Sequence, residues 1–110
     1  MSAIRYQGCP ACGAVWSLPR PLCPACGGAP EGREASGRGT VWSVTEVHRA
    51  APPAFADRMP YALALVELAE GPRVLARAPR GLAVGEAVVG AAETVETAEG
   101  PRDLPVFRRA

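Results

Sequence analysis

The sequence predicts a small, almost entirely β-structured protein in two parts, a metal-binding ribbon followed by a closed barrel of five strands. Three observations support this prediction. Two copies of Cys-Pro-Ala-Cys-Gly, at residues 9–13 and 23–27, contain all four cysteines of the chain. From Thr40 onward, β-branched and apolar residues fall into short runs separated by glycine and proline. No stretch repeats its apolar residues with a 3.6-residue period over three turns, so we expect little helix.

Each Cys-x-x-Cys-Gly repeat has the spacing of a metal-binding knuckle. The two intervening residues allow both sulfurs to face one point, and Gly13 and Gly27 can adopt the positive φ that brings backbone amides close to the sulfurs. Two knuckles supply four thiolates, a closed tetrahedral set for a structural metal. The predicted ligands are Cys9, Cys12, Cys23 and Cys26. We expect zinc, with iron in the same site as the less favoured metal.

Other uses of the cysteines fit the sequence less well. Two disulfides would require a secreted chain, and residues 1–8 lack the basic-then-apolar pattern of a signal peptide. A thioredoxin-like redox pair needs one Cys-x-x-Cys in a βαβ context. The longest strongly apolar run, Tyr61 to Val66, is too short to span a bilayer. We therefore expect a cytoplasmic protein with reduced thiols and no membrane contact.

Five strands are predicted after the ribbon. Their expected ranges are 40–48, 61–69, 74–78, 86–97 and a short 104–108. Five strands with a strongly twisted corner fit a closed barrel of the OB type. Residues 1–8 are interpreted as a lead-in and residues 28–39 as an exposed connection. This division predicts a ribbon over residues 1–36 and a barrel over residues 37–110.

The strand patterns also predict orientations. In the first barrel strand, alternation places Val41 on one face with Ser43, and Trp42 on the other with Val44. The strand at 61–69 is apolar almost throughout, so we expect it to be buried on both faces. Gly90 is expected to mark a bulge or corner.

Composition limits the range of functions. The chain has 110 residues, 48% of them hydrophobic but only 5% aromatic, so its core must be aliphatic and rich in alanine. The formal net charge is +1, and four thiolates on zinc would add about −2. This balance gives no basic footprint for a nucleic acid. The chain contains no lysine, which excludes Schiff-base and Walker-type chemistry.

The sequence offers little for catalysis by this chain alone. Its only histidine is His48, on a predicted strand, where a structural role is the commoner one. No Gly-x-Ser-x-Gly elbow is present. A closed four-thiolate site leaves no coordination position for a substrate. We therefore expect a protein that performs no chemistry by itself.

The order of motifs resembles a known family. A cysteine-knuckle ribbon is followed by Gly37-Arg38-Gly39-Thr40-Val41-Trp42-Ser43, a proline-rich loop, and Pro60-Tyr61-Ala62-Leu63-Ala64-Leu65-Val66-Glu67-Leu68. The chain then has Val84-Gly85-Glu86-Ala87-Val88 and closes with Leu104-Pro105-Val106-Phe107-Arg108. Together these segments resemble the family that joins a rubredoxin-like zinc ribbon to an OB-fold, the domain of unknown function thirty-five type.

The resemblance implies an acyl-CoA-associated accessory subunit. Members of this family pack on thiolase-like enzymes, acyl-CoA hydratases or aldolases and help to bind or channel the CoA ester. The implied partners are a thiolase-fold or hydratase catalytic subunit and an acyl-CoA, held as a shared ligand. Phosphate groups of CoA call for arginine, whose planar fork pairs well with them. The candidate arginines are Arg49, Arg58, Arg73, Arg77 and Arg80.

The loop from Arg49 to Tyr61 is the predicted contact with the catalytic partner. Prolines stiffen it, so little conformational entropy is lost when it is bound. Large apolar side chains anchor interfaces, and the loop carries Phe55, Met59 and Tyr61.

Two alternative functions remain open at this stage. An OB-fold that binds single-stranded nucleic acid would use Trp42, Phe55 and Tyr61 as stacking platforms. A small iron electron carrier would use the four-thiolate site.

Overall fold

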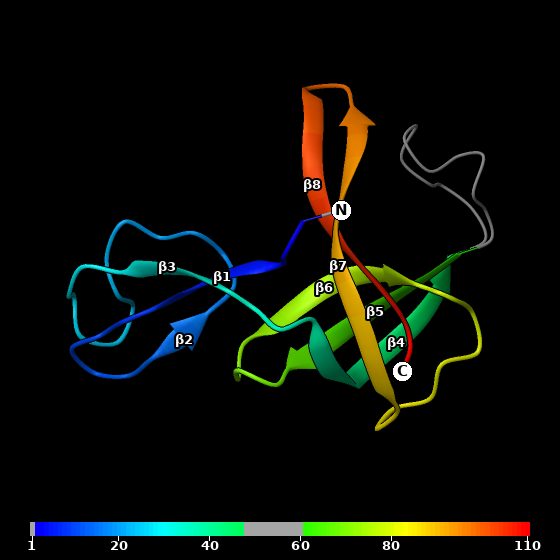
Figure 1. The fold of residues 1–110 in the computed structure, drawn as a ribbon, viewed down its shortest axis with the longest axis horizontal. Coiled ribbons are helices and arrows are strands. Elements are labelled where there is room, and N and C mark those ends of the chain that lie inside the picture. Colours follow the sequence, from blue (N-terminus) through cyan, green and yellow to red (C-terminus); the bar gives the residue numbers. More distant parts are fainter. Residues whose placement is uncertain (1, 48–60) are drawn as a thin grey trace.

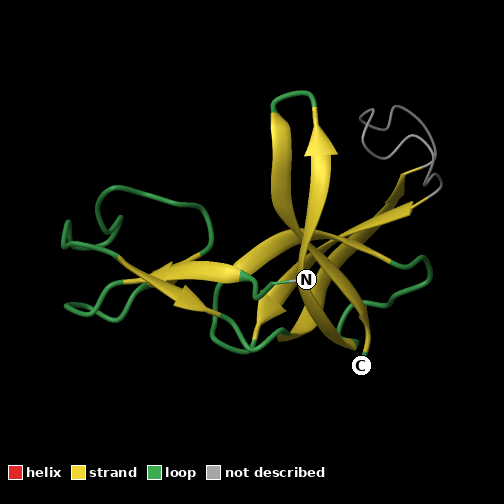
Figure 2. Cartoon of the chain, turned by 45° about the horizontal axis from the view of Figure 1, so that its top comes forward, coloured by secondary structure: helices red, strands yellow, loops and turns green. Residues whose placement is uncertain are grey.

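The computed structural model describes residues 2–47 and 61–110, which form only strands, turns and loops (Figure 2). A three-stranded sheet contains β1 (Arg5–Gly8), β2 (Val15–Trp16) and β3 (Glu31–Glu34) in the order β2-β1-β3. Five further strands form a closed barrel (Figure 1) in the order β4-β5-β6-β8-β7, with bounds β4 (Arg38–Val47), β5 (Tyr61–Leu68), β6 (Arg73–Ala78), β7 (Ala87–Thr97) and β8 (Gly100–Arg109). The predicted all-β architecture, ribbon then five-stranded barrel, is confirmed. These residues contain no helix long and apolar enough to cross a membrane.

The ribbon sheet was missed by sequence reasoning. β1 lies in the segment interpreted as a lead-in, and β3 lies in the segment interpreted as an exposed connection, so both interpretations were wrong. β1 is the central strand and pairs with β3 from Arg5↔Glu34 to Gly8↔Glu31. Glu-Gly-Arg-Glu carries no apolar alternation, and its pairing with β1 across more than twenty intervening positions supplies the strand conformation that its own residues do not favour.

The last strand is longer than predicted. β8 begins at Gly100, although Leu104 was the expected start, while the other four barrel strands match their predicted bounds to within two residues. β7 and β8 pair continuously from Val88↔Arg109 to Thr97↔Gly100. Pro101 and Pro105 both lie within β8, because a proline fits a strand wherever its missing N–H would point away from the paired neighbour.

Of the bulge or corner expected at Gly90, the bulge is absent, because β7 and β8 pair there without a register shift; the bulge lies in β4. The register of β4 against β5 shifts between Val41 and Ser43. Because the extra residue breaks the alternation, Val41 is buried and Val44 packs against the same core, while Trp42 is 50% exposed. The prediction that Val41 and Val44 lie on opposite faces was therefore wrong.

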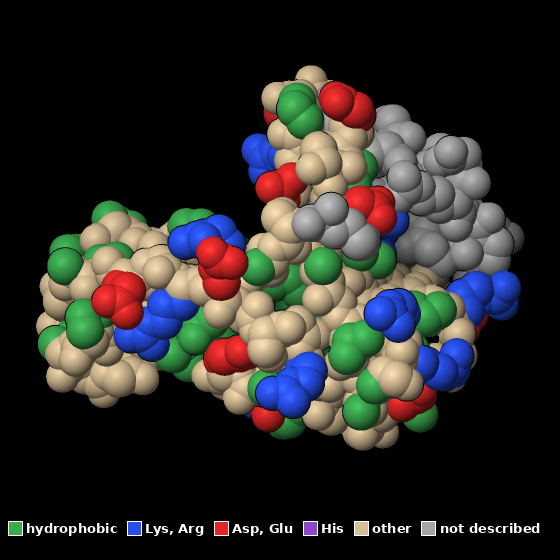
Figure 3. Space-filling model, in the orientation of Figure 1, with side chains coloured by type: hydrophobic (Ala, Val, Ile, Leu, Met, Phe, Trp, Pro, Cys, Tyr) green, Lys and Arg blue, Asp and Glu red, His purple; other side chains and the backbone are tan. Residues whose placement is uncertain are grey.

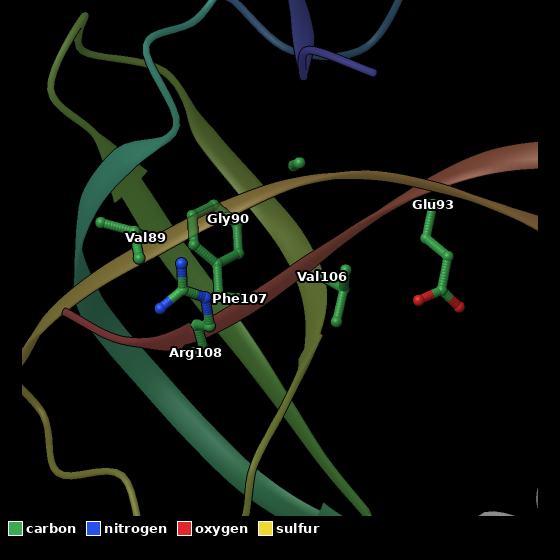
Figure 4. A pocket seen from close by; sticks show the side chains of 7 residues that line it. Val89, Gly90, Glu93, Val106, Phe107 and Arg108 are labelled. Atoms are coloured by element: carbon green, nitrogen blue, oxygen red, sulfur yellow. The ribbon is translucent and has the colours of Figure 1, made fainter. Parts of the chain in front are cut away.

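Gly90 instead allows close packing beneath β7. A Cβ at this position would collide with the carbonyl oxygen of Val106 and lie 2.7 Å from the ring of Phe107. Phe107 is 2% exposed, and its ring lies next to Gly90 in the small pocket of Figure 4, which has a volume of about 260 Å³. The Gly90 N–H also donates to the carbonyl oxygen of Gly37, which has φ +93. Glycine is needed here for space.

The barrel core is small and aliphatic, as the composition predicted. β5 contributes Ala62, Ala64, Val66 and Leu68, all 2% exposed or less. The residues between them are only partly buried, so the expectation that β5 is buried on both faces was wrong. Ile4 and Tyr6, from the start of the ribbon, belong to the same core cluster as Phe107. The ribbon and the barrel therefore share apolar packing.

Glu70 fixes the connection between the ribbon and the barrel. Its Oε2 accepts a hydrogen bond from the backbone N–H of Ser36, in the segment that leads from β3 to β4, at 2.8 Å. Burial alone would raise the pKa of Glu70, but hydrogen bonds from Ser36 and from the backbone of Glu70 itself, together with the charge of Arg38, outweigh it and hold the pKa below its ordinary value. The neighbouring turn residue Gly71 approaches Val15 of the ribbon. The β5–β6 turn thus holds the ribbon in place.

We expect Glu70→Gln to destabilise the protein at pH 7 by about 1 kcal/mol, because a neutral acceptor replaces a charged one. Since the folded pKa is lowered, the stabilisation is complete above the unfolded pKa of about 4.3 and is lost as the pH falls through the folded pKa. Thermal unfolding of both proteins should show a difference that is unchanged between pH 7 and about pH 5 and shrinks as the pH falls further. Both proteins have the same four cysteines, so the contribution of the metal site to stability cancels in the difference between them. A difference that is constant with pH would contradict this role.

Candidate metal centre and the surfaces around it

The four cysteines come together at the end of the ribbon away from the barrel. Each knuckle is closed by an equivalent backbone hydrogen bond: Gly13 N–H donates to the Cys9 carbonyl at 2.8 Å, and Gly27 N–H donates to the Cys23 carbonyl at 2.9 Å. Gly13 and Gly27 have φ values of 82° and 78°, as the repeat predicted. The four Sγ atoms all lie within 4.8 Å of one another.

The knuckles approach each other in a paired arrangement. Cys9 Sγ lies 3.5 Å from Cys26 Sγ, and Cys12 Sγ lies 3.6 Å from Cys23 Sγ. Cys9 and Cys23 are buried, while Cys12 and Cys26 are exposed. The first cysteine of each knuckle therefore faces the interior of the ribbon, and the second faces solvent.

The four thiols differ in acidity because of this arrangement. For Cys23, burial raises the pKa, but the backbone N–H groups of Cys26 and Ala25, together with the side chains of Cys12 and Cys26, outweigh it and bring the pKa to about 6. For Cys26, the backbone of Gly28 lowers the pKa, but the neighbouring thiols raise it to about 12. Four thiols this close cannot all ionise without a cation between them.

A metal ion fits this donor set. Four sulfur ligands in two knuckles match the closed tetrahedral coordination of structural zinc, and backbone N–H groups aimed at the sulfurs stabilise thiolates. Ala25 N–H lies 3.4 Å from Cys23 Sγ and provides one such donor. Cys9, Cys12, Cys23 and Cys26 are thus brought together as the spacing predicted, and they can hold a metal ion.

The described candidate arginines each form an ion pair with a carboxylate. Arg73 pairs with Glu67 at 3.2 Å and lies 3.7 Å above the ring of Trp42. Arg77 pairs with Glu93 at 2.6 Å, and its side chain is 12% exposed. Arg80 pairs with Glu46 at 3.4 Å. Each arginine has a different carboxylate partner.

The other predicted site residues lie outside the described residues. Arg49, Phe55, Arg58 and Met59 belong to the segment 48–60, as does His48. Tyr61 is the first residue of β5, and only its backbone is described.

Sequence reasoning missed a groove of about 710 Å³ between the ribbon, the barrel and the β7–β8 hairpin. Leu18 of the ribbon and Leu75 of β6 line it and are 70% and 63% exposed. Figure 3 shows apolar side chains where the ribbon meets the barrel. No local signal predicts this groove, because its walls come from three separate parts of the chain.

The fold and the four-cysteine site define a protein that joins a metal-binding ribbon to an OB-type barrel. The family described as the C-terminal OB-fold domain of ChsH2 matches residues 32–92, and this chain belongs to it.

Two curated relatives resemble the chain in sequence. A probable enoyl-CoA hydratase alpha subunit from Thermomonospora curvata is 38% identical over 107 residues, which cover 94% of this chain and 33% of the relative. A DUF35 domain-containing scaffold protein from Methanocaldococcus jannaschii is 40% identical over 68 residues, which cover 60% of this chain and 48% of the relative. The chain therefore spans a third to about half of the length of these relatives.

Two solved structures share the fold. A chain of the Ltp2-ChsH2(DUF35) aldolase has a TM-score of 0.77 and 36% identity, and the match covers 97% of this chain and 84% of that one. A DUF35-family protein of unknown function from Sulfolobus solfataricus has a TM-score of 0.60 and 18% identity, covering 98% and 76%. The first likeness confirms the resemblance seen in the sequence, and the second concerns the fold alone.

Proposed function

We propose that this chain is a non-catalytic accessory subunit of an acyl-CoA-processing enzyme. Residues 1–36 form a zinc ribbon that stabilises the fold, and residues 37–110 form the barrel that contacts a hydratase or thiolase-fold catalytic subunit. The chain helps to bind or channel the acyl-CoA and stabilises its partner.

One observation carries this proposal. The likeness to the chain of an aldolase named for both Ltp2 and ChsH2(DUF35) extends over nearly the whole of this protein. The hydratase-subunit and scaffold names of the relatives point to the same class of assembly. The four-cysteine centre supports a structural role for the ribbon, because a closed thiolate set offers no position to a substrate.

Purification from the native host tests the association. A tagged chain should retain a hydratase, aldolase or thiolase-type subunit through size exclusion, at a fixed ratio. The matched control is the same tag on Val84→Ala, a change at a side chain that is 67% exposed on the barrel surface. A chain that elutes alone from its own host, with its metal bound, would contradict the proposal.

Acyl-CoA phosphates are proposed to contact the arginines around β6 and the 48–60 segment, namely Arg49, Arg58, Arg73, Arg77 and Arg80. Arg73 and Arg80 have side chains that are 45% and 52% exposed in their ion pairs. Exposed pairs of this kind are weak, so a phosphate can replace the carboxylate. Arg77 is more buried and is the least available of the three described.

We expect Arg73→Ala combined with Arg80→Ala to weaken binding of an acyl-CoA to the complex about tenfold, as the loss of two charge-assisted contacts predicts. Calorimetry measures this affinity, and a comparison of an acyl-CoA with its dephospho form shows how much of the affinity depends on the phosphate that the dephospho form lacks. The control is Arg5→Ala, at a ribbon side chain that is 63% exposed. If neither this double variant nor Arg49→Ala with Arg58→Ala changes the affinity, these arginines do not bind the phosphates.

A further inference from the structure

The β7–β8 hairpin extends beyond the barrel. β4 pairs with β7 only at Ala87, Val88 and Val89, and β6 pairs with β8 only at Val106. Residues 93–104, here called the arm, project away from the barrel body (Figures 1 and 2). Within the arm, β7 and β8 pair with each other.

The two edges of the arm differ in their capacity to accept another strand. Successive residues of an antiparallel strand direct their backbone groups to opposite edges. The outer edge of β8 carries Pro101 and Pro105, and proline has no N–H to offer. These prolines protect that edge from pairing with another chain, as edge prolines commonly do.

The outer edge of β7 has no such protection. Ala92 donates to the carbonyl oxygen of Ser2 at 2.7 Å and accepts from the Ser2 N–H at 3.0 Å. Alternation therefore directs the N–H and C=O groups of Thr94 and Glu96 to the same edge. Across ranges 2–47 and 61–110, these groups have no partner. Ser2 thus occupies the first position of an edge that continues open toward the tip of the arm.

The charge of the arm limits what can bind there. Glu96 and Asp103 are exposed on one face of the arm, where Thr94 Oγ1 donates to Asp103 at 2.7 Å. Figure 3 shows acidic side chains along this projection. A second copy paired edge to edge would bring Glu96 close to the same acidic face, and like charges across a pair are unfavourable. A basic segment from a different chain fits better.

We propose that the edge of β7 at Thr94 and Glu96 binds an extended segment of the catalytic partner, added as a strand antiparallel to β7. A basic side chain of that segment lies opposite Glu96. The backbone of the segment pairs with Thr94 and Glu96 along the same edge of β7 on which Ser2 pairs with Ala92. This inference rests on the proposed function, because it names where the partner binds. Binding by strand addition relies on main-chain hydrogen bonds for affinity and on side chains for specificity.

The test is the affinity of the purified chain for the catalytic subunit that it retains from its host. Thr94→Pro removes the outward N–H but none of the bonds to β8, and Thr94→Val is its matched control, because both lose the hydroxyl and only the proline loses the N–H. We expect Thr94→Pro to bind at least about tenfold more weakly than Thr94→Val. Glu96→Lys should weaken binding by a similar factor, while Glu96→Gln has a smaller effect. Thermal unfolding of each free variant establishes that it is folded.

The outcomes separate this inference from the proposed function. Equal affinity for Thr94→Pro and Thr94→Val, in a complex that still forms, would overturn the strand addition and leave the accessory role intact. If Thr94→Pro does not fold, unchanged affinity on Glu96→Lys would overturn it equally. Failure of the wild-type chain to bind the subunit would overturn both.

Discussion

Cys12→Ser is expected to purify without stoichiometric metal and with an unfolded ribbon. Removing one thiolate opens the closed set of four sulfurs that lie within 4.8 Å of one another. Structural zinc contributes about 10–16 kcal/mol of binding free energy in small domains, and that energy is also folding energy. The loss should therefore exceed the effect of any single apolar substitution in the chain.

Elemental analysis and amide NMR measure the two consequences. Wild type should carry one zinc per chain and be colourless, whereas iron would make the oxidised protein red. The matched control is Ala11→Ser, which introduces the same side chain one position earlier, at an exposed site. We expect Ala11→Ser to keep its metal. A Cys12→Ser protein with dispersed ribbon amides would show that the four sulfurs do not hold the fold together.

Phe107→Ala is expected to produce the largest loss in the barrel. Phe107 is the largest fully buried side chain in the described ranges 2–47 and 61–110, and Gly90 leaves room for its ring against β7. Truncating a buried phenylalanine costs about 3–5 kcal/mol. In a domain of this size, that corresponds to a fall in Tm of at least about 12 °C.

Gly90→Ala tests the same packing by adding a methyl group where the ring of Phe107 lies against β7. A Cβ there would lie 2.7 Å from the Phe107 ring and closer still to the carbonyl oxygen of Val106. We expect this variant also to lose stability, by about 1–3 kcal/mol, because the backbone must move to relieve the clash. Val84→Ala, at a side chain 67% exposed, should change Tm by no more than about 4 °C. A Phe107→Ala protein as stable as the Val84→Ala control would contradict this packing.

The sequence predicted those features that depend on local spacing. Cys9 and Cys23 take equivalent places because each begins the same five-residue repeat, and the barrel strands follow from runs of β-branched and apolar residues. β3 and the outer part of β8 were missed because partners distant in the chain stabilise them. The bulge at Val41/Ser43 was missed because one extra residue leaves no mark in the composition.

The candidate surfaces were predicted less well for a related reason. An arginine's partner depends on which strands are neighbours, so the pairing of Arg77 with Glu93 followed from no motif. The open edge of β7 becomes visible only when the positions of Ser2 and Pro105 relative to the hairpin are known. The arginine ion pairs and the open edge of β7 both depend on which distant strands pair with each other, and this pairing does not follow from local sequence patterns.

The rate of acyl-CoA turnover, measured while this chain is added to its catalytic subunit, tests the accessory role most directly. The account predicts no turnover by the chain alone, and a rate for the catalytic subunit that rises and then saturates at a fixed ratio of the two chains. Turnover by the chain alone, or a rate that is the same at every ratio, would contradict it.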